Sequence, residues 1–149
     1  MAENNQNLIT MVITQNEKVT DPNEESPTAS VVIELFPDIA PNHVNQIKTL
    51  ISEEFYDGII FHRVIEGFMA QTGDPTGTGM GGSDLPDIRA EFTRTPFERG
   101  TLGMARSQHP DSANSQFFIC FQEASFLNNQ YTVFGNCLLY TSDAADDRV

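Results

Sequence analysis

The stretch from residue 59 to residue 72, IIFHRVIEGFMAQT, most constrains what this chain can fold into. Branched and aromatic residues dominate it, and Gly67 divides it into two pieces of strand length. The pattern therefore predicts two strands with a bend between them rather than a helix. Arg63 and Glu66 are its only formally charged residues at pH 7. Long charged side chains are almost never fully buried without a partner, so we expect the Arg63 guanidinium at the edge of an apolar surface.

Two further strand patterns and one helical pattern precede this stretch. Residues 8–14 alternate weakly, and residues 31–36 alternate branched and polar side chains with a period of two. The acidic, proline-containing segment 15–30 between them predicts a loop that joins the two strands as a long hairpin. Apolar residues then recur at helical spacing after Pro41, which suits a first helical turn. We expect a capping helix of about three turns near 41–54.

Several short strand candidates follow in the second half of the chain, and turn residues separate them. They are residues 90–92, 101–105, 117–121 and 131–134. Many short strands, few helical patterns and no alternation of strands with helices predict a mainly β fold, with an antiparallel sheet closed into a barrel or sandwich. A length of 149 residues is typical of one domain with a core of its own.

The charge balance excludes some classes of partner. The chain has 21 acidic and 8 basic residues, a formal net charge of −13. Such a surface repels phosphate backbones and anionic lipid, so we expect no nucleic-acid binding and no membrane binding. No apolar stretch has the length of a membrane span, and the first ten residues have neither a basic start nor an apolar signal core. We therefore expect a soluble, cytoplasmic protein.

Familiar cofactor motifs are absent or lack the secondary structure that they require. Gly77, Gly79 and Gly82 fit the spacing G-x-G-x-x-G, but Pro86 follows closely and prevents the early helix that a dinucleotide site requires. We therefore reject a nucleotide-binding interpretation and expect a surface loop.

The titratable residues likewise suggest no proton shuttle. Ser107, His109 and Asp111 are alternate residues of one loop and cannot converge as a catalytic triad. Cys120 lies in an apolar run and is expected to be a buried structural thiol, and neither it nor Cys137 has a zinc-like neighbour or is expected to form a disulfide. The sequence predicts no cofactor and no metal.

Four motifs together carry a family resemblance. FHRVIEGFMAQTGD, followed in order by GTLGMA, SQFFICF and YTVFG, resembles the cyclophilin-type peptidyl-prolyl cis-trans isomerases, in a bacterial-like form, from about Leu8 to Gly135. The resemblance implies an eight-stranded antiparallel closed β-barrel with a helix at each end. It implies no cofactor.

The last residues depart from the family pattern. NCLLYTSDAADDRV, residues 136–149, resembles no ending of this family. We therefore expect a cyclophilin-like isomerase domain over residues 1–135, without the family's second helix and closing strand, followed by an atypical tail of foreign origin over 136–149. Missing strands leave unpaired edges and uncovered core, so we also expect lower stability than in a relative that has these elements.

The resemblance also implies a role for each matching residue. Arg63 matches the catalytic arginine. The remaining positions match the substrate-binding groove, with a proline pocket of Phe68, Met69, Phe118 and Leu127, a backbone-binding glutamine at Gln71, groove positions at Ala105 and Gln116, and walls at Phe126 and Tyr131.

Three of the groove positions depart from common family residues. Phe126 stands where many eukaryotic members have tryptophan, and Tyr131 stands where they have histidine. Phenylalanine keeps an aromatic wall but lacks the indole donor, so we expect weak cyclosporin binding at most. Arg106 stands in place of a common asparagine whose backbone touches the substrate.

The family's activity gives the unexplained arginine a task. Rotation about an X-Pro bond passes a barrier of about 18–20 kcal/mol. The prolyl nitrogen becomes a hydrogen-bond acceptor only in the twisted state, so a fixed guanidinium aimed at it stabilises the transition state selectively. The resemblance thus implies a monomeric isomerase that acts on proline-containing peptides and unfolded protein chains and assists folding. The alternative is a proline-peptide-binding interaction module without significant catalysis, and Arg63 discriminates between the two.

Overall fold

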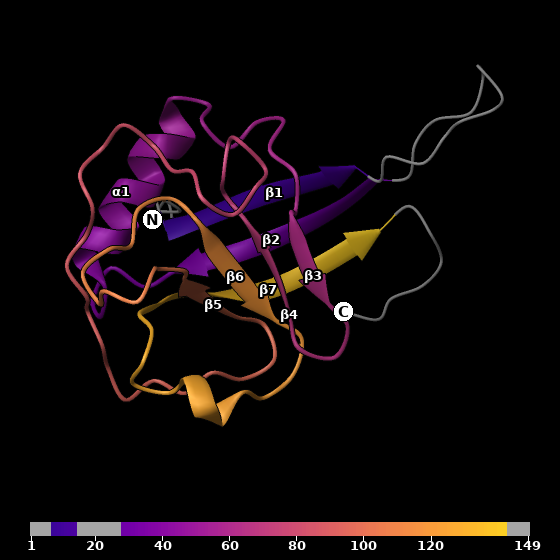
Figure 1. The fold of residues 1–149 in the computed structure, drawn as a ribbon. Coiled ribbons are helices and arrows are strands. Elements are labelled where there is room, and N and C mark those ends of the chain that lie inside the picture. The colour runs from indigo at the N-terminus through magenta and orange to yellow at the C-terminus, as the bar shows by residue number, and fades with distance from the viewer. Residues whose placement is uncertain (1–6, 15–27, 143–149) are drawn as a thin grey trace, which may run out of the picture.

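The protein is a curled, seven-stranded antiparallel sheet with an α-helix packed against it (Figure 1). The computed structural model describes residues 7–14 and 28–142, with the backbone alone for residues 139–142. The elements in chain order are β1 (Leu8–Thr14), β2 (Thr28–Leu35), α1 (Pro41–Ser52), β3 (Arg63–Ile65), β4 (Met69–Thr72), β5 (Thr101–Met104), β6 (Phe117–Cys120), the 3-10 helix η2 (Ser125–Leu127) and β7 (Val133–Ser142). Within the sheet the strands follow the order β1-β2-β7-β5-β6-β4-β3.

The predicted mainly β, antiparallel fold is confirmed, and so are its best-defined elements. β1 pairs with β2 as a hairpin from Leu8 opposite Glu34 to Thr14 opposite Thr28. The helix begins at Pro41, as the sequence predicts, and ends at Ser52. The expected closure is not seen in the part of the chain that the structure describes, where seven strands form an open sheet with β1 and β3 at its edges. The described strands therefore form a curled half-barrel, with one strand fewer than the eight of the family's closed barrel.

The strand predicted at residues 90–92 is wrong, because its backbone donors bond side chains instead of a neighbouring strand. The amide of Ala90 donates to Asp111 Oδ1 at 2.9 Å, and the amide of Glu91 donates to Thr132 Oγ1 at 2.9 Å. Residues 90–92 are irregular and have no ladder partner within the described residues. The nearest bridge is two residues earlier, between Ile88 and Ala113.

The longest strand, β7, fills the place between β2 and β5. It runs from Val133 to Ser142 and pairs with β2 from Gly135 opposite Leu35 to Ser142 opposite Ala29. Residues 136–142, which were expected to belong to an atypical tail, are thus paired with β2 through their backbone. The division of the chain at residue 135 stays a prediction.

Two apolar clusters make up the core. The first lies between α1 and the sheet, where Val44 and Ile47 of the helix pack with Ile33 and Leu35 of β2 and with residues of β5, β6 and β7. The second cluster draws on β4, β6, η2 and the start of β7 and consists of buried Met69, Phe97, Phe118, Cys120, Ala124, Leu127 and Val133. The candidate site is built on the second cluster.

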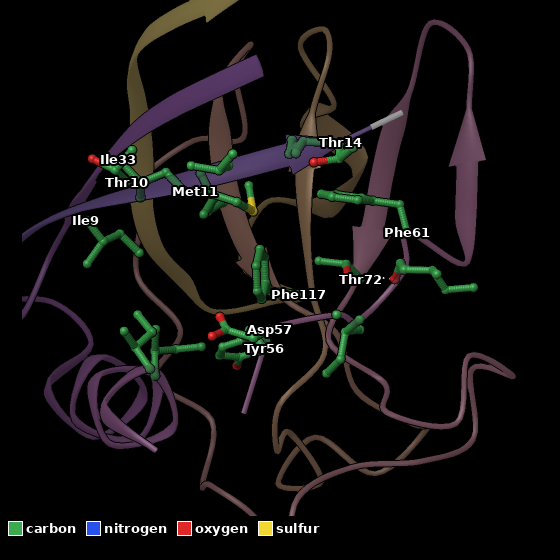
Figure 2. A pocket seen from close by; sticks show the side chains of 18 of the residues that line it. Ile9, Thr10, Met11, Thr14, Ile33, Tyr56, Asp57, Phe61, Thr72 and Phe117 are labelled. Carbon is green, nitrogen blue, oxygen red and sulfur yellow. Dashed lines mark hydrogen bonds between the residues drawn. The ribbon is translucent and has the colours of Figure 1, made fainter. Parts of the chain in front are cut away.

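A cavity of about 850 Å³ opens into the first cluster beside β1. Figure 2 shows Ile9 and Met11 of β1 facing Tyr56, Phe61 and Phe117 across it. Among the described strands β1 pairs with β2 alone, so its other edge is the rim of this opening. The half-barrel is therefore incompletely filled on the side away from the second cluster.

None of the helices within residues 7–14 and 28–142 combines the length and the apolar character that crossing a membrane requires.

Candidate active site

Three predicted site residues form one row across three neighbouring strands. Arg63 of β3 lies opposite Gln71 of β4, and Gln71 lies opposite Phe118 of β6. Directly opposed residues of antiparallel strands point to the same face of the sheet. Because adjacent strands are about 4.8 Å apart, Arg63 and Phe118 are about 10 Å apart across the sheet. The register therefore brings a guanidinium, an amide and an aromatic ring together on one surface.

A tight turn at Gly67 sets this register. Gly67 has φ of 77°, a left-handed conformation that glycine adopts without a steric penalty. The amide of Phe68 donates to the carbonyl of Ile65 at 3.0 Å and closes the turn. Met69 consequently lies opposite Ile65, and Gln71 opposite Arg63. The predicted pair of strands with a bend at Gly67 is confirmed.

The Arg63 guanidinium has no hydrogen-bonding partner among the described residues and is in this sense uncommitted. Its side chain is exposed, and it makes no hydrogen bond or ion pair with any residue that the structure describes. A surface ion pair, the structural alternative for this residue, is thus not seen in the described part of the chain. All five N–H donors of Arg63 remain for a ligand at the edge of the apolar surface.

The residues of the predicted proline pocket lie in one apolar cluster along the row from Arg63, and we call this group of residues the pocket. Phe118, its floor, is 5% exposed and stacks on Phe97 with ring centroids 5.7 Å apart. The Tyr131 ring stands at 89° to the Phe118 ring with centroids 5.7 Å apart, so the two rings meet edge to face. Met69 and Leu127 are buried in the same cluster, and Phe68, Ala105 and Tyr131 pack against it half-buried. The structure therefore brings the predicted pocket residues together.

Phe126 forms the outer rim of the pocket. It lies in η2, whose turn is closed by hydrogen bonds from the amides of Leu127 and Asn128 to the carbonyls of Ala124 and Ser125. Its side chain is 69% exposed, and its ring lies 5.5 Å from the Phe68 ring at 39°. An aromatic side chain this exposed is available to a ligand in the groove.

Gln71 and Gln116 connect the row to the glycine-rich loop. Gln71 Nε2 donates to Gln116 Oε1 at 2.9 Å, and Gln116 Nε2 donates to the carbonyls of Gly79 at 3.0 Å and Gly81 at 2.8 Å. These bonds fix both amides beside the row. They also give the loop the role of a support for the groove.

The glycine-rich loop is folded around a carboxylate and not around an open anion site. Buried Asp74 accepts hydrogen bonds from the amides of Thr76, Thr78 and Gly79 at 2.8, 3.1 and 2.6 Å. Burial acts to raise the pKa of Asp74, but the Thr76 hydroxyl and the amides of Gly81, Thr76 and Gly79 outweigh it and hold the pKa well below its usual range. The amides that a phosphate would need are occupied, which agrees with rejection of the nucleotide interpretation.

Other chemistry is not supported by the described residues. Cys120 is 1% exposed, and burial raises its pKa to about 11, so it is a structural thiol as predicted. Ser107 bonds Ser112 at 2.7 Å, while His109 Nδ1 accepts from the Asp111 amide at 3.0 Å, so the three triad candidates do not converge. Residues 7–14 and 28–142 contain no group of three potential ligands arranged to hold a metal ion.

Arg106 was identified from sequence only as a departure from the family pattern, and its contact with the site was not predicted. Arg106 follows Ala105 and places its guanidinium over the Tyr131 ring, 4.7 Å from the centroid. In the sequence, its position directly after an apolar strand is the local signal for such a contact, because a charged side chain there must leave the core next to the residues that the strand supports.

Comparisons with known proteins agree with this geometry. The family model of cyclophilin-type peptidyl-prolyl cis-trans isomerases matches residues 22–142. A probable peptidyl-prolyl cis-trans isomerase of Brucella suis is 55% identical over 127 residues, which is 78% of this chain and 64% of that protein. A peptidyl-prolyl cis-trans isomerase of Helicobacter pylori strain J99 is 40% identical over 122 residues, covering 80% of this chain and 74% of that protein. Among solved structures, the chain is similar to a cyclophilin-type peptidyl-prolyl cis-trans isomerase of Cryptosporidium parvum, crystallised in the presence of the dipeptide Ala-Pro. The two superpose with a TM-score of 0.70 at 35% sequence identity, and the match covers 73% of this chain and 72% of that protein.

Proposed function

This chain belongs to the family of cyclophilin-type peptidyl-prolyl cis-trans isomerases, and on that premise we propose that it catalyses rotation about X-Pro peptide bonds in protein chains. The chain spans 64% of the length of its Brucella relative. The observation that carries the proposal is the row of Arg63, Gln71 and Phe118, in which an uncommitted guanidinium lies beside an apolar pocket.

Arg63 is the catalytic residue of the proposed reaction. A planar X-Pro amide delocalises the nitrogen lone pair, whereas the twisted amide localises it on a pyramidal nitrogen. An N–H donor from Arg63 therefore bonds that nitrogen more strongly in the transition state than in either planar state, which is the condition for catalysis. No bond to the protein forms, and no proton is transferred.

The pocket and the two amides hold the rest of the substrate. The floor of Phe118, with Met69 and Leu127 beside it, offers an apolar surface for the pyrrolidine ring. Gln71 donates one bond to Gln116, so the orientation of its amide is set before a ligand arrives. A substrate backbone beside Arg63 meets this pre-oriented amide, which lowers the entropy lost on binding.

The test is exchange spectroscopy on a short Xaa-Ala-Pro-Phe peptide with the wild type and with Arg63→Ala. The wild type should exchange cis and trans signals, and Arg63→Ala should slow exchange by about 100-fold or more, the usual effect of removing one transition-state donor. Peptide affinity should change by less than about threefold, because the pocket is intact.

Arg94→Ala is the matched control. Arg94 is exposed and lies in the irregular segment before Phe97, outside the three strands that carry the row, so this variant removes one positive charge and should keep wild-type exchange. Full activity in Arg63→Ala would overturn the catalytic role. Peptide binding without exchange in the wild type would support the alternative of a proline-binding interaction module.

The same proposal extends to the cellular setting. We propose a monomeric, cytoplasmic protein that assists the folding of unfolded, proline-containing chains and binds neither nucleic acid nor membranes. The net charge of −13 supports the last two points, and the buried thiol of Cys120 suits a reducing compartment. Weak cyclosporin binding is proposed because the rim residue Phe126 presents hydrocarbon alone, without a hydrogen-bond donor.

A further inference from the structure

We propose that Arg106 is a positioning residue, which holds the Tyr131 wall of the pocket upright by stacking on it while binding three backbone carbonyls. The inference rests on the proposed function, because Tyr131 matters for turnover only if the pocket takes proline. Arg106 does not itself touch the reacting amide in this scheme. It acts through the ring that it covers.

The guanidinium lies between two aromatic rings. Its central carbon is 4.7 Å from the ring centroid of Tyr131 and 5.9 Å from that of Phe92. Both distances are within the range of about 6 Å at which a cation is attracted to the face of an aromatic ring. Phe92 belongs to the irregular segment before β5, so the contact also joins that segment to the groove.

Hydrogen bonds fix the guanidinium in this place. Nε and Nη2 both donate to the carbonyl of Gln130, at 3.2 and 2.6 Å, while Nη1 donates to the carbonyls of Ser107 at 2.9 Å and Gln108 at 3.4 Å. Four hydrogen bonds thus occupy most of the five N–H donors of the guanidinium. Most donors of Arg106 are therefore occupied by protein carbonyls, in contrast to those of Arg63, and this disfavours a direct role of Arg106 in binding substrate.

These contacts join two loops that both carry pocket residues. Arg106 lies two residues after β5 and follows Ala105, and Gln130 precedes Tyr131, which lies two residues before β7. The Tyr131 ring is held between the guanidinium and the perpendicular ring of Phe118. Its hydroxyl makes no hydrogen bond to a residue within the described ranges, so ring contacts alone orient it. Removal of Arg106 frees one side of the wall.

Lysine cannot replace this arrangement. An ammonium is a point charge with three donors, whereas the planar guanidinium stacks flat on a ring and reaches several carbonyls in its own plane. The inference therefore predicts that Arg106→Lys behaves like Arg106→Ala and not like the wild type. If the site needed only a positive charge, Arg106→Lys would behave like the wild type and not like Arg106→Ala.

The first measurement separates binding from the bond rotation. In Arg106→Ala and Arg106→Lys we expect the peptide Kd to rise about two- to fivefold, as loss of one partly exposed cation–aromatic contact implies. The exchange rate at saturating peptide should stay within about twofold of wild type, because Arg63 is untouched. Arg94→Ala, another loss of an arginine, should leave both quantities unchanged. An unchanged Kd in both Arg106 variants would overturn the inference.

The second measurement does not depend on activity. The side-chain Nε–Hε signal of Arg106 should be shifted upfield by the Tyr131 ring and should move to an ordinary position in Tyr131→Leu. The double variant Arg106→Ala, Tyr131→Leu should lose no more affinity than Tyr131→Leu alone, since the two residues act as one unit. Additive losses, or an Arg106 signal insensitive to Tyr131→Leu, would refute the positioning role of Arg106. Absence of cis-trans exchange in the wild type would refute the proposed function instead, while the Arg106 signal would still report on its contact with Tyr131.

Discussion

At the scale of single residues, the two arginines of the site differ in what surrounds them and not in chemistry. Arg63 is exposed without a described partner, whereas Arg106 gives four hydrogen bonds to backbone carbonyls and covers Tyr131. An uncommitted donor can bond a group that appears only in a transition state, and a saturated one cannot. The assignment of Arg63 to chemistry and of Arg106 to support follows from this difference.

His43 is a further residue whose surroundings determine its behaviour. It is fully buried near the start of α1, and its Nδ1 lies 2.6 Å from Glu91 Oε1, which also accepts the His43 amide at 2.9 Å. Nε2 is buried and has no partner among the described residues. Burial lowers the pKa of His43, although the hydrogen bond and the charge of Glu91 act in the opposite direction. The ring is therefore neutral in the folded protein.

This predicts a pH-dependent stability. The unfolded chain takes up a proton on His43 near pH 6.5, but the folded ring has a lower pKa and binds that proton only at lower pH. The contribution of His43 is thus fully present above about pH 6.5 and is lost as the pH falls below it. Urea unfolding between pH 7.5 and 5 should give a steeper loss of unfolding free energy in the wild type than in His43→Leu. Equal slopes would contradict the assignment, and His109→Gln in the exposed loop serves as the control.

At the scale of elements, the floor of the pocket depends on a close approach between β5 and β6. Gly103 lies opposite Phe118, and a Cβ at Gly103 would meet the rings of Phe118 and Phe97 at 2.5 Å. Real Cβ atoms do not approach so closely, so a larger residue there must displace the stacked pair. β5 thus supports the site without contributing a side chain at this position.

Gly103→Ala should therefore damage both stability and binding. Overpacking of this kind costs about 1–3 kcal/mol of unfolding free energy, and displacement of the Phe118 floor should weaken peptide binding as well. Gly135→Ala is the matched control, because its Cβ would meet the Glu34 carbonyl at 2.8 Å, far from the pocket. We expect that variant to lose stability but to keep its affinity for peptide once folded. Thermal unfolding and peptide titration of both variants measure the difference.

The elements also show what the sequence could predict. Period-two alternation and the bend at Gly67 identified β2, β3 and β4, and helical spacing after Pro41 identified α1, because these signals are local. The strand expected at residues 90–92 failed because Asp111 and Thr132, both distant in sequence, take its backbone donors. Periodicity reports only local patterns, so it cannot detect hydrogen-bond partners that are distant in sequence.

The site itself was predicted through family resemblance and not through local pattern. Arg63 and Phe118 are brought together by the strand order β6-β4-β3, which no stretch of sequence specifies. Arg106 and Tyr131 are likewise joined only in the folded chain, so their contact had no local signal. Apolar patterning did indicate that Phe118 is buried, but it could not separate a pocket floor from ordinary core.

At the scale of the whole molecule, the half-barrel has a well-packed side and an open side. The candidate site rests on the buried cluster around Phe118, whereas the cavity of about 850 Å³ opens beside β1. Figure 2 shows the sulfur of Met11 directed into that cavity. Val12, the next residue, is 64% exposed on the outer face of the same strand. An exposed apolar edge strand of this kind is an aggregation hazard.

Substitution of these two neighbours by lysine should have different effects. Val12→Lys places a charge on the exposed face of an edge strand, so we expect less aggregation at high concentration with little change in melting temperature. Met11→Lys directs a charge toward the apolar cavity and should lower the melting temperature. Light scattering and thermal unfolding of both variants provide the measurements. Equal effects of the two substitutions would show that β1 does not present alternate faces as described.

The turn at Gly67 leaves Arg63 on β3, a strand of three exposed residues at the edge of the sheet. Edge segments with few buried contacts open at a much lower free energy than the interior, and their amides exchange with solvent first. Met69, Phe118 and Leu127 belong instead to the buried interior. Mild warming or dilute denaturant would thus unfold β3, which carries the Arg63 guanidinium, before it unfolds the pocket. Under the proposed function, the protein in that intermediate range would still bind proline-containing peptides but would no longer isomerise their X-Pro bonds, and this loss would be reversible.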